Sequence, residues 1–240
     1  MGPGDGTLVP TLQSDPDFLL LVVGLIGTTI TPYMQLFQQS AVVEKGVGRD
    51  DYAPERADAY IGAIFGNVIS AFIIIATGAT LHVAGVTDIQ TAQDAAQALA
   101  PVAGTAAVWL FAIGLLGASL IAGGVLPLAT AYSVSEAFGF RKGVNLDFRS
   151  APMFQGLFSV LLVLGAAVAL IPGIPVIQLL VGIQVLNGAL LPIILVFILL
   201  LAQNGRLMGR MRNGRVTTIL GWATFVMITL AVLILFASSR

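Results

Sequence analysis

The stretch GTTITPYMQLFQQS, at residues 27–40, decides how this chain folds. Its polar residues, together with a glycine just before it, recur at steps of four and three, which places them on one face of a helix. They are Gly24, Thr28, Thr31, Gln35 and Gln38. A polar stripe that crosses a bilayer must face protein or water, because polar side chains are costly in lipid. The stretch therefore predicts a membrane-spanning helix with one face directed away from lipid.

Pro32 interrupts this helix near its middle. A proline has no N–H, and its ring clashes with the carbonyl of the residue four positions earlier, here Thr28. That carbonyl then needs another partner, and in transporters an unwound backbone carbonyl at mid-membrane often coordinates a cation. A plain proline kink, with the freed carbonyl accepting a hydrogen bond from a neighbouring threonine hydroxyl, explains the spacing equally well.

The composition of the whole chain fits a membrane protein. Of its 240 residues 57% are hydrophobic and only 10% are charged, against about 25% charged residues in soluble proteins. Long apolar runs of about 20 residues favour membrane-spanning helices over the alternating strands of a barrel. We predict an all-α integral membrane fold with six spans: Phe18–Val43, Ala59–Leu81, Gly104–Ala131, Phe154–Ile171, Val176–Leu201 and Thr217–Phe236.

The basic residues predict an orientation in the membrane. Apart from the C-terminal Arg240, they occupy three loops. Lys45, Arg49 and Arg56 lie between the first and second spans, Arg141, Lys142 and Arg149 lie between the third and fourth, and Arg206, Arg210, Arg212 and Arg215 lie between the fifth and sixth. The positive-inside rule makes these loops cytoplasmic and puts both termini outside. Residues 1–17 then form an external segment, and residues 18–240 form a single six-helix domain.

The N-terminal residues predict that the chain is part of something longer. Residues 1–17 include three aspartates and no Lys or Arg, so they lack the basic leader of a secretory signal. A chain that begins outside without a signal is what one expects of the back half of a longer transporter, cut in an external loop.

Several classes of function are disfavoured. The chain has no cysteine and one histidine, which excludes disulfides and thiolate metal sites. It shows no Ser–His pair at plausible depth and no carboxylate pair within the bilayer, so we do not expect an enzyme. Its basic clusters are too small to predict nucleic-acid binding. We expect no resident cofactor.

Other polar residues carry weaker predictions. Gln184 and Asn187 lie three apart on one face of the fifth span, and they either line a cation path or bond to a neighbouring helix. Glu136, near the inner end of the third span, is expected to form a salt bridge, with a role in cation exit less favoured. In the outer loop, Thr87 and Gln90 fit a capping box for a short surface helix that Pro101 ends, with a structureless loop as the alternative.

The stretch at residues 27–40 resembles the sixth transmembrane helix of the NRAMP family of divalent-metal transporters. There a small residue and two spacers precede Met-Pro-His, and a second His follows farther along. The resemblance continues through four later motifs in family order. They are Leu120–Phe138 (eighth helix), the stretch QVLNGALLP at residues 184–192 (tenth), the Asn-x-x-x-Met-Gly-x-x-x-Asn loop at residues 204–213, and Gly221-Trp222 (eleventh).

The resemblance implies a fold and a set of ligands. The fold is the second inverted repeat of a LeuT-like bundle plus one peripheral helix. Matched by position, Thr28 supplies a metal-binding carbonyl, Thr31 replaces the metal-binding methionine, Tyr33 and Gln38 replace the two histidines, and Gln184 is the nearest candidate for the tenth-helix glutamine. Gln35 and Asn187 are added as residues that line the same path.

These departures bear on the choice of ion. A thioether favours softer transition metals, whereas hydroxyl and carbonyl oxygens suit Mg²⁺ or Ca²⁺. Loss of both histidines also removes the residues best suited to relay protons. The combination resembles the NRAMP-related magnesium transporters, while Met34 keeps Mn²⁺ and Fe²⁺ open.

The resemblance also implies a partner. The family's first helix carries an Asp-Pro-Gly motif that supplies the only charged metal ligand, and that helix has no counterpart here. We therefore expect divalent-cation transport in company with five further N-terminal helices. The alternative is a non-transporting membrane scaffold or regulatory subunit.

Overall fold

The computed structural model describes residues 16–48, 50–83, 85, 89 and 91–238. Within these residues, six helical stretches are long and apolar enough to cross a membrane. They are Pro16–Glu44, Tyr52–His82, Gly104–Phe138, Pro152–Ala169, Val176–Gln203 and Arg215–Ala237. Each contains or closely overlaps one predicted span, so the all-α membrane fold is confirmed.

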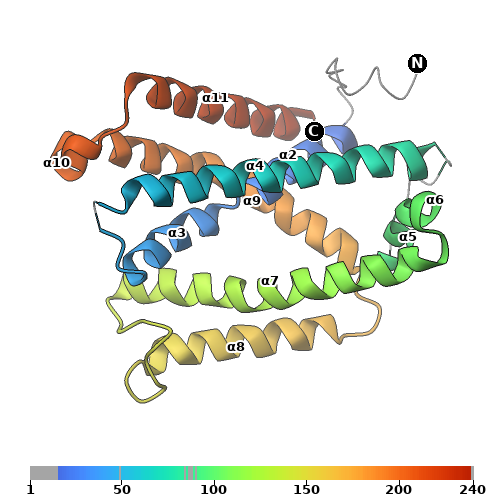
Figure 1. The fold of residues 1–240 in the computed structure, drawn as a ribbon, viewed down its shortest axis with the longest axis horizontal. Helices are drawn as coiled ribbons and strands as arrows, with labels where there is room; N and C mark the ends of the chain where they lie inside the picture. Colours follow the sequence, from blue (N-terminus) through green and yellow to red (C-terminus); the bar gives the residue numbers. More distant parts are fainter. Residues whose placement is uncertain (1–15, 49, 84, 86–88, 90, 239–240) are drawn as a thin grey trace. The chain divides into compact units, whose positions relative to one another are not determined.

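The individual helices are shown in Figure 1. The first span is made of two helices, α2 (Pro16–Thr29) and α3 (Pro32–Glu44). The others are α4 (Tyr52–Thr77), which continues as a π-helical turn over Gly78–His82, α7 (Ala107–Phe138), α8 (Pro152–Ala169), α9 (Val176–Gln203) and α11 (Arg215–Ser238). Short helices lie between them, namely α5 (Ala92–Ala96), α6 (Ala100–Ala103) and α10 (Gly205–Met208).

The chain divides into two compact units. In its described part, the first unit holds residues 36–177, with most of α3 and the helices from α4 to α8. The second holds residues 16–35 and 178–238, with α2 and the helices from α9 to α11. A single domain over residues 18–240 stays a prediction, and most of the predicted external segment 1–17 lies outside the described residues.

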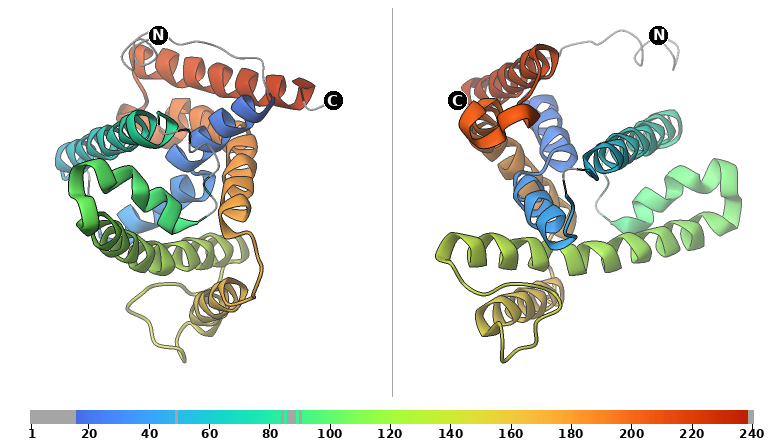
Figure 2. Two further views of the ribbon diagram at one scale, coloured as in Figure 1. Left: turned by 90° about the vertical axis from the view of Figure 1, so that its right-hand side faces the viewer. Right: turned by 60° about the vertical axis from the view of Figure 1, so that its left-hand side comes forward.

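The first unit is centred on aromatic contacts between three helices. Tyr132 of α7 meets the Phe154 ring of α8 edge-on, with centroids 4.8 Å apart, and Phe37 of α3 lies 5.9 Å from the same tyrosine. Ala131 and Ala151 are buried beside them. These contacts hold α8 along α7, as Figures 1 and 2 show, and attach α3 to the end of α7 that carries Tyr132.

The second unit packs α2, α9 and α11 around an aliphatic core. Its buried members are Leu19 and Val23 from α2, Leu191 from α9, and Ile228, Val232 and Leu235 from α11. Branched aliphatic side chains at steps of three and four fill the space between helices without placing any polar atom in lipid. This core fixes α2 against α9, where the candidate site lies.

Large apolar side chains cover the outside of the first unit. No residue of α4 is buried, and Phe65 and Phe72 each expose 67% of their surface. Trp109 and Leu120 of α7 expose 73% and 71%. Apolar surface of this extent marks contact with lipid or with further protein.

The loop between α4 and α7 differs in part from its prediction. Thr91 Oγ1 accepts a hydrogen bond from Asp94 N (3.1 Å), and the Asp94 carboxylate accepts from Thr91 N (2.9 Å), which makes a capping box at the start of α5. The box predicted at Thr87 and Gln90 lies outside the described residues. The prediction that Pro101 ends the helix was wrong, because Pro101 stands in the first turn of α6, where a missing N–H costs nothing.

Candidate metal-ion site

The predicted break in the first span is present. The regular helix α2 ends at Thr29, and α3 begins at Pro32. The Ile30 N–H still donates to the Ile26 carbonyl (2.9 Å), so the helical hydrogen-bond pattern extends one residue beyond the end of α2. Pro32 has no N–H to donate to Thr28, and the last carbonyls of any helix lack partners within it. The Thr28 carbonyl oxygen is therefore without its usual helical donor.

Proline alone does not explain this break. Helix α7 continues through Pro127, and α9 continues through Pro192. The sequences before the prolines differ, because the β-branched run Thr28–Thr31 precedes Pro32, whereas Ala189–Leu191 precede Pro192. β-branched residues are weaker helix formers than Ala and Leu, which separates Pro32 from Pro192. Gly123 and Gly124, which are weaker helix formers still, precede Pro127, so helix propensity alone does not separate Pro32 from Pro127.

Two glycines bring α2 and α9 into backbone contact. A Cβ built on Gly27 would lie 2.0 Å from the Gln184 carbonyl oxygen and 2.5 Å from the Gly188 nitrogen. A Cβ built on Gly188 would lie 2.4 Å from the Val23 carbonyl oxygen. Only glycine fits at either position, as is usual where membrane helices cross closely. Since Thr28 follows Gly27, the crossing sets the last turn of α2 against the middle of α9.

A cleft of about 410 Å³ opens beside this crossing. Thr28 and Gln184 both line it, from α2 and α9 respectively. Asn187 is buried and donates from Nδ2 to the Gln184 side-chain oxygen (2.9 Å), which holds the glutamine in place. The rest of the lining is glycine and aliphatic, namely Leu21, Gly24, Leu25, Leu180 and Val181. The cleft thus combines polar oxygens with apolar walls.

The predicted site residues fall into two groups. Thr28, Gln184 and Asn187 are brought together at the α2–α9 crossing. The others follow the break along the chain: Thr31 lies in the break and Tyr33 in the first turn of α3, both half-buried, while Gln35 and Gln38 are exposed on α3. Gln38 belongs to the first unit and the other six belong to the second. That these residues bind metal stays a prediction.

The chemistry of the cleft is that of neutral oxygen donors. Backbone carbonyl, hydroxyl and amide oxygens are ligands suited to hard cations such as Mg²⁺ and Ca²⁺. Across the described ranges, no three His, Cys, Asp or Glu side chains come together in a group that could hold a metal. A divalent cation in this cleft would need its charge balanced by a carboxylate from elsewhere.

A polar anchor holds the far end of α3 within the first unit. Ser40 is 4% exposed, and its hydroxyl donates to the Glu136 carboxylate (2.8 Å), which also pairs with Lys142. Glu44 accepts from the Val144 N–H (2.9 Å). The salt bridge predicted for Glu136 is confirmed, but the role of Ser40 was missed, since a lone serine in a helix gives no sign of its partner. Below the break, α3 is therefore fixed to the end of α7.

Comparison with known proteins gives one family match. The model of the family described as Nramp, natural resistance-associated macrophage protein-like, matches residues 4–238. The match covers both helices of the broken span and all of α9.

Curated relatives are similar along nearly the whole chain. The divalent metal cation transporter MntH of Ralstonia nicotianae is 28% identical over 246 residues, which cover 94% of this chain and 52% of that protein. MntH of Clostridium acetobutylicum is 27% identical over 97% of this chain and 52% of its own length. MntH of Klebsiella pneumoniae is 27% identical over 91% and 50%. The chain thus spans about half the length of these relatives.

Proposed function

This chain belongs to the Nramp family, and from that premise we propose that it forms the C-terminal half of a divalent metal cation transporter. The relatives named above are divalent metal cation transporters of about twice its length. The observation that carries the proposal is the cleft at the α2–α9 crossing, where Thr28 and Gln184 lie together beside a broken helix. A break of this kind provides the unpaired backbone carbonyls that bind cations in transporters.

The proposed ligands are the oxygens of Thr28, Thr31 and Gln184. Of the remaining candidates, Tyr33, Gln35 and Asn187 belong to the same unit and are proposed to line or support the same path, whereas Gln38 belongs to the first unit and stays a predicted ligand only. Thr31 and Tyr33 are half-buried at and just after the break, which suits groups that meet a partly dehydrated ion. Since this set has no thioether or imidazole, we propose that Mg²⁺ is carried in preference to Mn²⁺ and Fe²⁺.

The proposed ligands carry no negative charge, so we propose that the N-terminal helices of the transporter supply it. A neutral oxygen cage binds a divalent ion weakly, so an acidic ligand is expected from the N-terminal five helices. The exposed apolar faces of α4 and α7 provide surface for those helices to cover. We propose that both termini of this chain lie outside the cell and that the three basic loops lie in the cytoplasm.

Uptake of Mg²⁺ and Mn²⁺ into proteoliposomes tests this function, using the complete transporter that contains this half. Gln184→Leu removes a proposed ligand and is expected to lower uptake at limiting ion by at least about tenfold. Gln178→Leu is the matched control, because it makes the same change on α9 at an exposed position that does not line the cleft. The control should transport as the wild type does.

Two outcomes would contradict the proposal. Equal ion uptake by Gln184→Leu and Gln178→Leu would show that Gln184 is not a ligand on the ion path. Absence of any divalent-cation uptake by the complete wild-type protein would favour the alternative, a membrane scaffold or regulatory subunit.

A further inference from the structure

The turn between α9 and α11 carries a concentrated positive charge. It contains Arg206, Arg210, Arg212 and Arg215, and no Asp or Glu follows Asp147 anywhere in the sequence. Among the described residues of the second unit, the only acid is therefore Asp17 at the start of α2. Nothing in α9, α10 or α11 can neutralise these guanidinium groups. A basic cluster directly beside membrane-spanning helices attracts anionic lipid.

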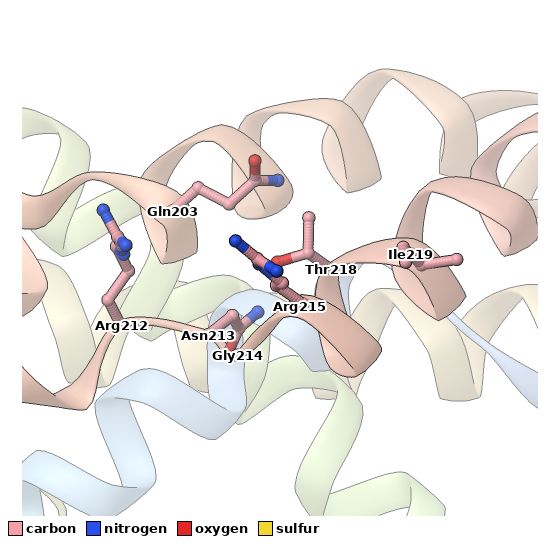
Figure 3. Close-up of a pocket in the computed structure, with 7 residues that line it drawn as sticks. All are labelled: Gln203, Arg212, Asn213, Gly214, Arg215, Thr218 and Ile219. Carbon is pink, nitrogen blue, oxygen red and sulfur yellow. The ribbon is translucent and has the colours of Figure 1, made fainter.

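Two of the arginines line a pocket of about 470 Å³ at the start of α11. Figure 3 shows the side chains of Arg212, Arg215 and Gln203 around the same opening, with Thr218 beside Arg215. The buried Nε2 of Gln203 has no hydrogen-bond partner in the part of the chain that the structure describes. The remaining lining residues are Asn213, Gly214 and Ile219. The pocket thus presents cationic and neutral N–H donors, and its charge suits an anion.

The pocket continues into an apolar groove. This second hollow has a volume of about 680 Å³ and shares Thr218 and Ile219 with the pocket. Its other lining residues all come from one face of α11: Trp222, Ala223, Val226, Met227 and Leu230. From Thr218 to Leu230 the helix rises by about 18 Å, close to the depth of one leaflet of the hydrocarbon core.

We propose that the pocket and the groove together hold one anionic phospholipid. The phosphate sits between Arg212 and Arg215, where guanidinium groups can each give two parallel hydrogen bonds to phosphate oxygens, and Gln203 adds an amide donor. One acyl chain lies along α11 from Ile219 to Leu230. A free phosphate would use the pocket alone, whereas a lipid also accounts for the adjoining groove.

The test measures lipid retention by the full chain in detergent, using native mass spectrometry. Phosphatidylglycerol and phosphatidylcholine with identical acyl chains are compared as probes. The pocket variant is Arg212→Gln/Arg215→Gln, and the matched control is Arg206→Gln/Arg210→Gln, which removes the same charge from the same turn outside the pocket. We expect the pocket variant to lose affinity for phosphatidylglycerol roughly tenfold more than the control does.

Further measurements distinguish a bound phospholipid from a bound inorganic anion and from general electrostatic attraction to the basic turn. Excess inorganic phosphate should fail to displace phosphatidylglycerol, and Ala223→Trp, which fills the groove from an exposed position, should lower its retention. If the two double variants lose equal affinity for phosphatidylglycerol, the lipid is attracted by the overall positive charge of the turn and not by the pocket, which would overturn the proposed site. Complete displacement by inorganic phosphate, or full retention by Ala223→Trp, would overturn the lipid.

A second variant keeps the test sound if the glutamine pair does not fold. Arg212→Lys/Arg215→Lys retains the charge but not the planar pair of donors. It should bind phosphatidylglycerol more weakly than the wild type while retaining its preference over phosphatidylcholine. Wild-type affinity in this variant would contradict direct guanidinium–phosphate contact.

Discussion

At the scale of single residues, the contact between Gly27 and Gly188 determines where the candidate ligands lie. The two backbones touch, and this contact sets Thr28 beside Gln184 in one cleft. The polar residues could be identified from their spacing along the chain. The family resemblance implied that Thr28 and Gln184 serve one site, but spacing alone could not show that they meet, because the contact depends on glycines whose importance appears only when the helices cross.

Gly27→Ala should therefore destabilise the second unit. A methyl group at Gly27 would overlap the Gln184 carbonyl, which the backbone cannot avoid by a side-chain rotation. We expect the free energy of unfolding to fall by an amount at the upper end of the roughly 1–3 kcal/mol that overpacking costs, which would appear as a lower melting temperature in detergent. Gly182→Ala on α9 meets nothing within 4 Å and serves as the control. Equal melting temperatures for the two variants would contradict the close crossing.

Thr31 is the residue on which ion choice is expected to depend most. In a complete transporter, Thr31→Met should shift uptake towards Mn²⁺ and away from Mg²⁺, because a thioether serves a transition metal better than it serves a small hard ion. The bulkier side chain should also hinder a hydrated Mg²⁺. Uptake of both ions by wild type and variant would be measured side by side. A wild type that carries Mn²⁺ and ignores Mg²⁺ would refute the hard-ligand argument.

At the scale of elements, the prolines in the interior of three spans, Pro32, Pro127 and Pro192, separate what sequence can and cannot predict. The break at Pro32 was predicted from the proline and the polar stripe, yet α7 and α9 pass through Pro127 and Pro192 unbroken. A proline rule applied uniformly would have broken all three helices. The four consecutive β-branched residues before Pro32 separate it from Pro192, but Gly123 and Gly124 precede Pro127 in a continuous helix, so local helix propensity does not by itself predict which proline breaks its span.

Pro32→Ala should partly repair the break. The alanine N–H can donate to the Thr28 carbonyl, so amide exchange just after the break, at Tyr33 and Met34, should slow by roughly fivefold relative to the wild type, and ion uptake should fall. Hydrogen–deuterium exchange measures the first effect and proteoliposome uptake the second. Pro192→Ala, in a helix that is already continuous, is the control. Unchanged exchange in Pro32→Ala would show that other residues maintain the break.

The anchor of α3 shows the limit of prediction for elements more generally. Glu136 was expected to make a salt bridge at the membrane surface, and its pairing with Lys142 follows from their closeness in sequence. The added bond from Ser40 joins residues 96 positions apart and could not be foreseen. It matters because it ties α3, the helix that follows the break, to α7.

At the scale of the whole molecule, the predicted spans and their membrane character are confirmed, because apolar runs of this length have few alternatives. Where the basic loops lie is still a prediction. Since the chain has no native cysteine, single cysteines report cleanly. Those introduced at Thr91 or Ser238 should react with an impermeant thiol reagent in sealed cells, and those at Val144 or Asn213 should not. The reverse pattern would invert the orientation.

The central claim is that a divalent cation binds at the α2–α9 crossing, and locating the ion tests it most directly. Crystals of the complete transporter grown with Mn²⁺ and measured near the manganese absorption edge give their strongest anomalous signal at the metal. We predict a peak within about 2.0–2.6 Å of the Thr28 carbonyl oxygen, in the cleft that Gln184 lines. A peak remote from both residues, or a continuous helix through Thr28 with its carbonyl bonded within its own turn, would contradict the account.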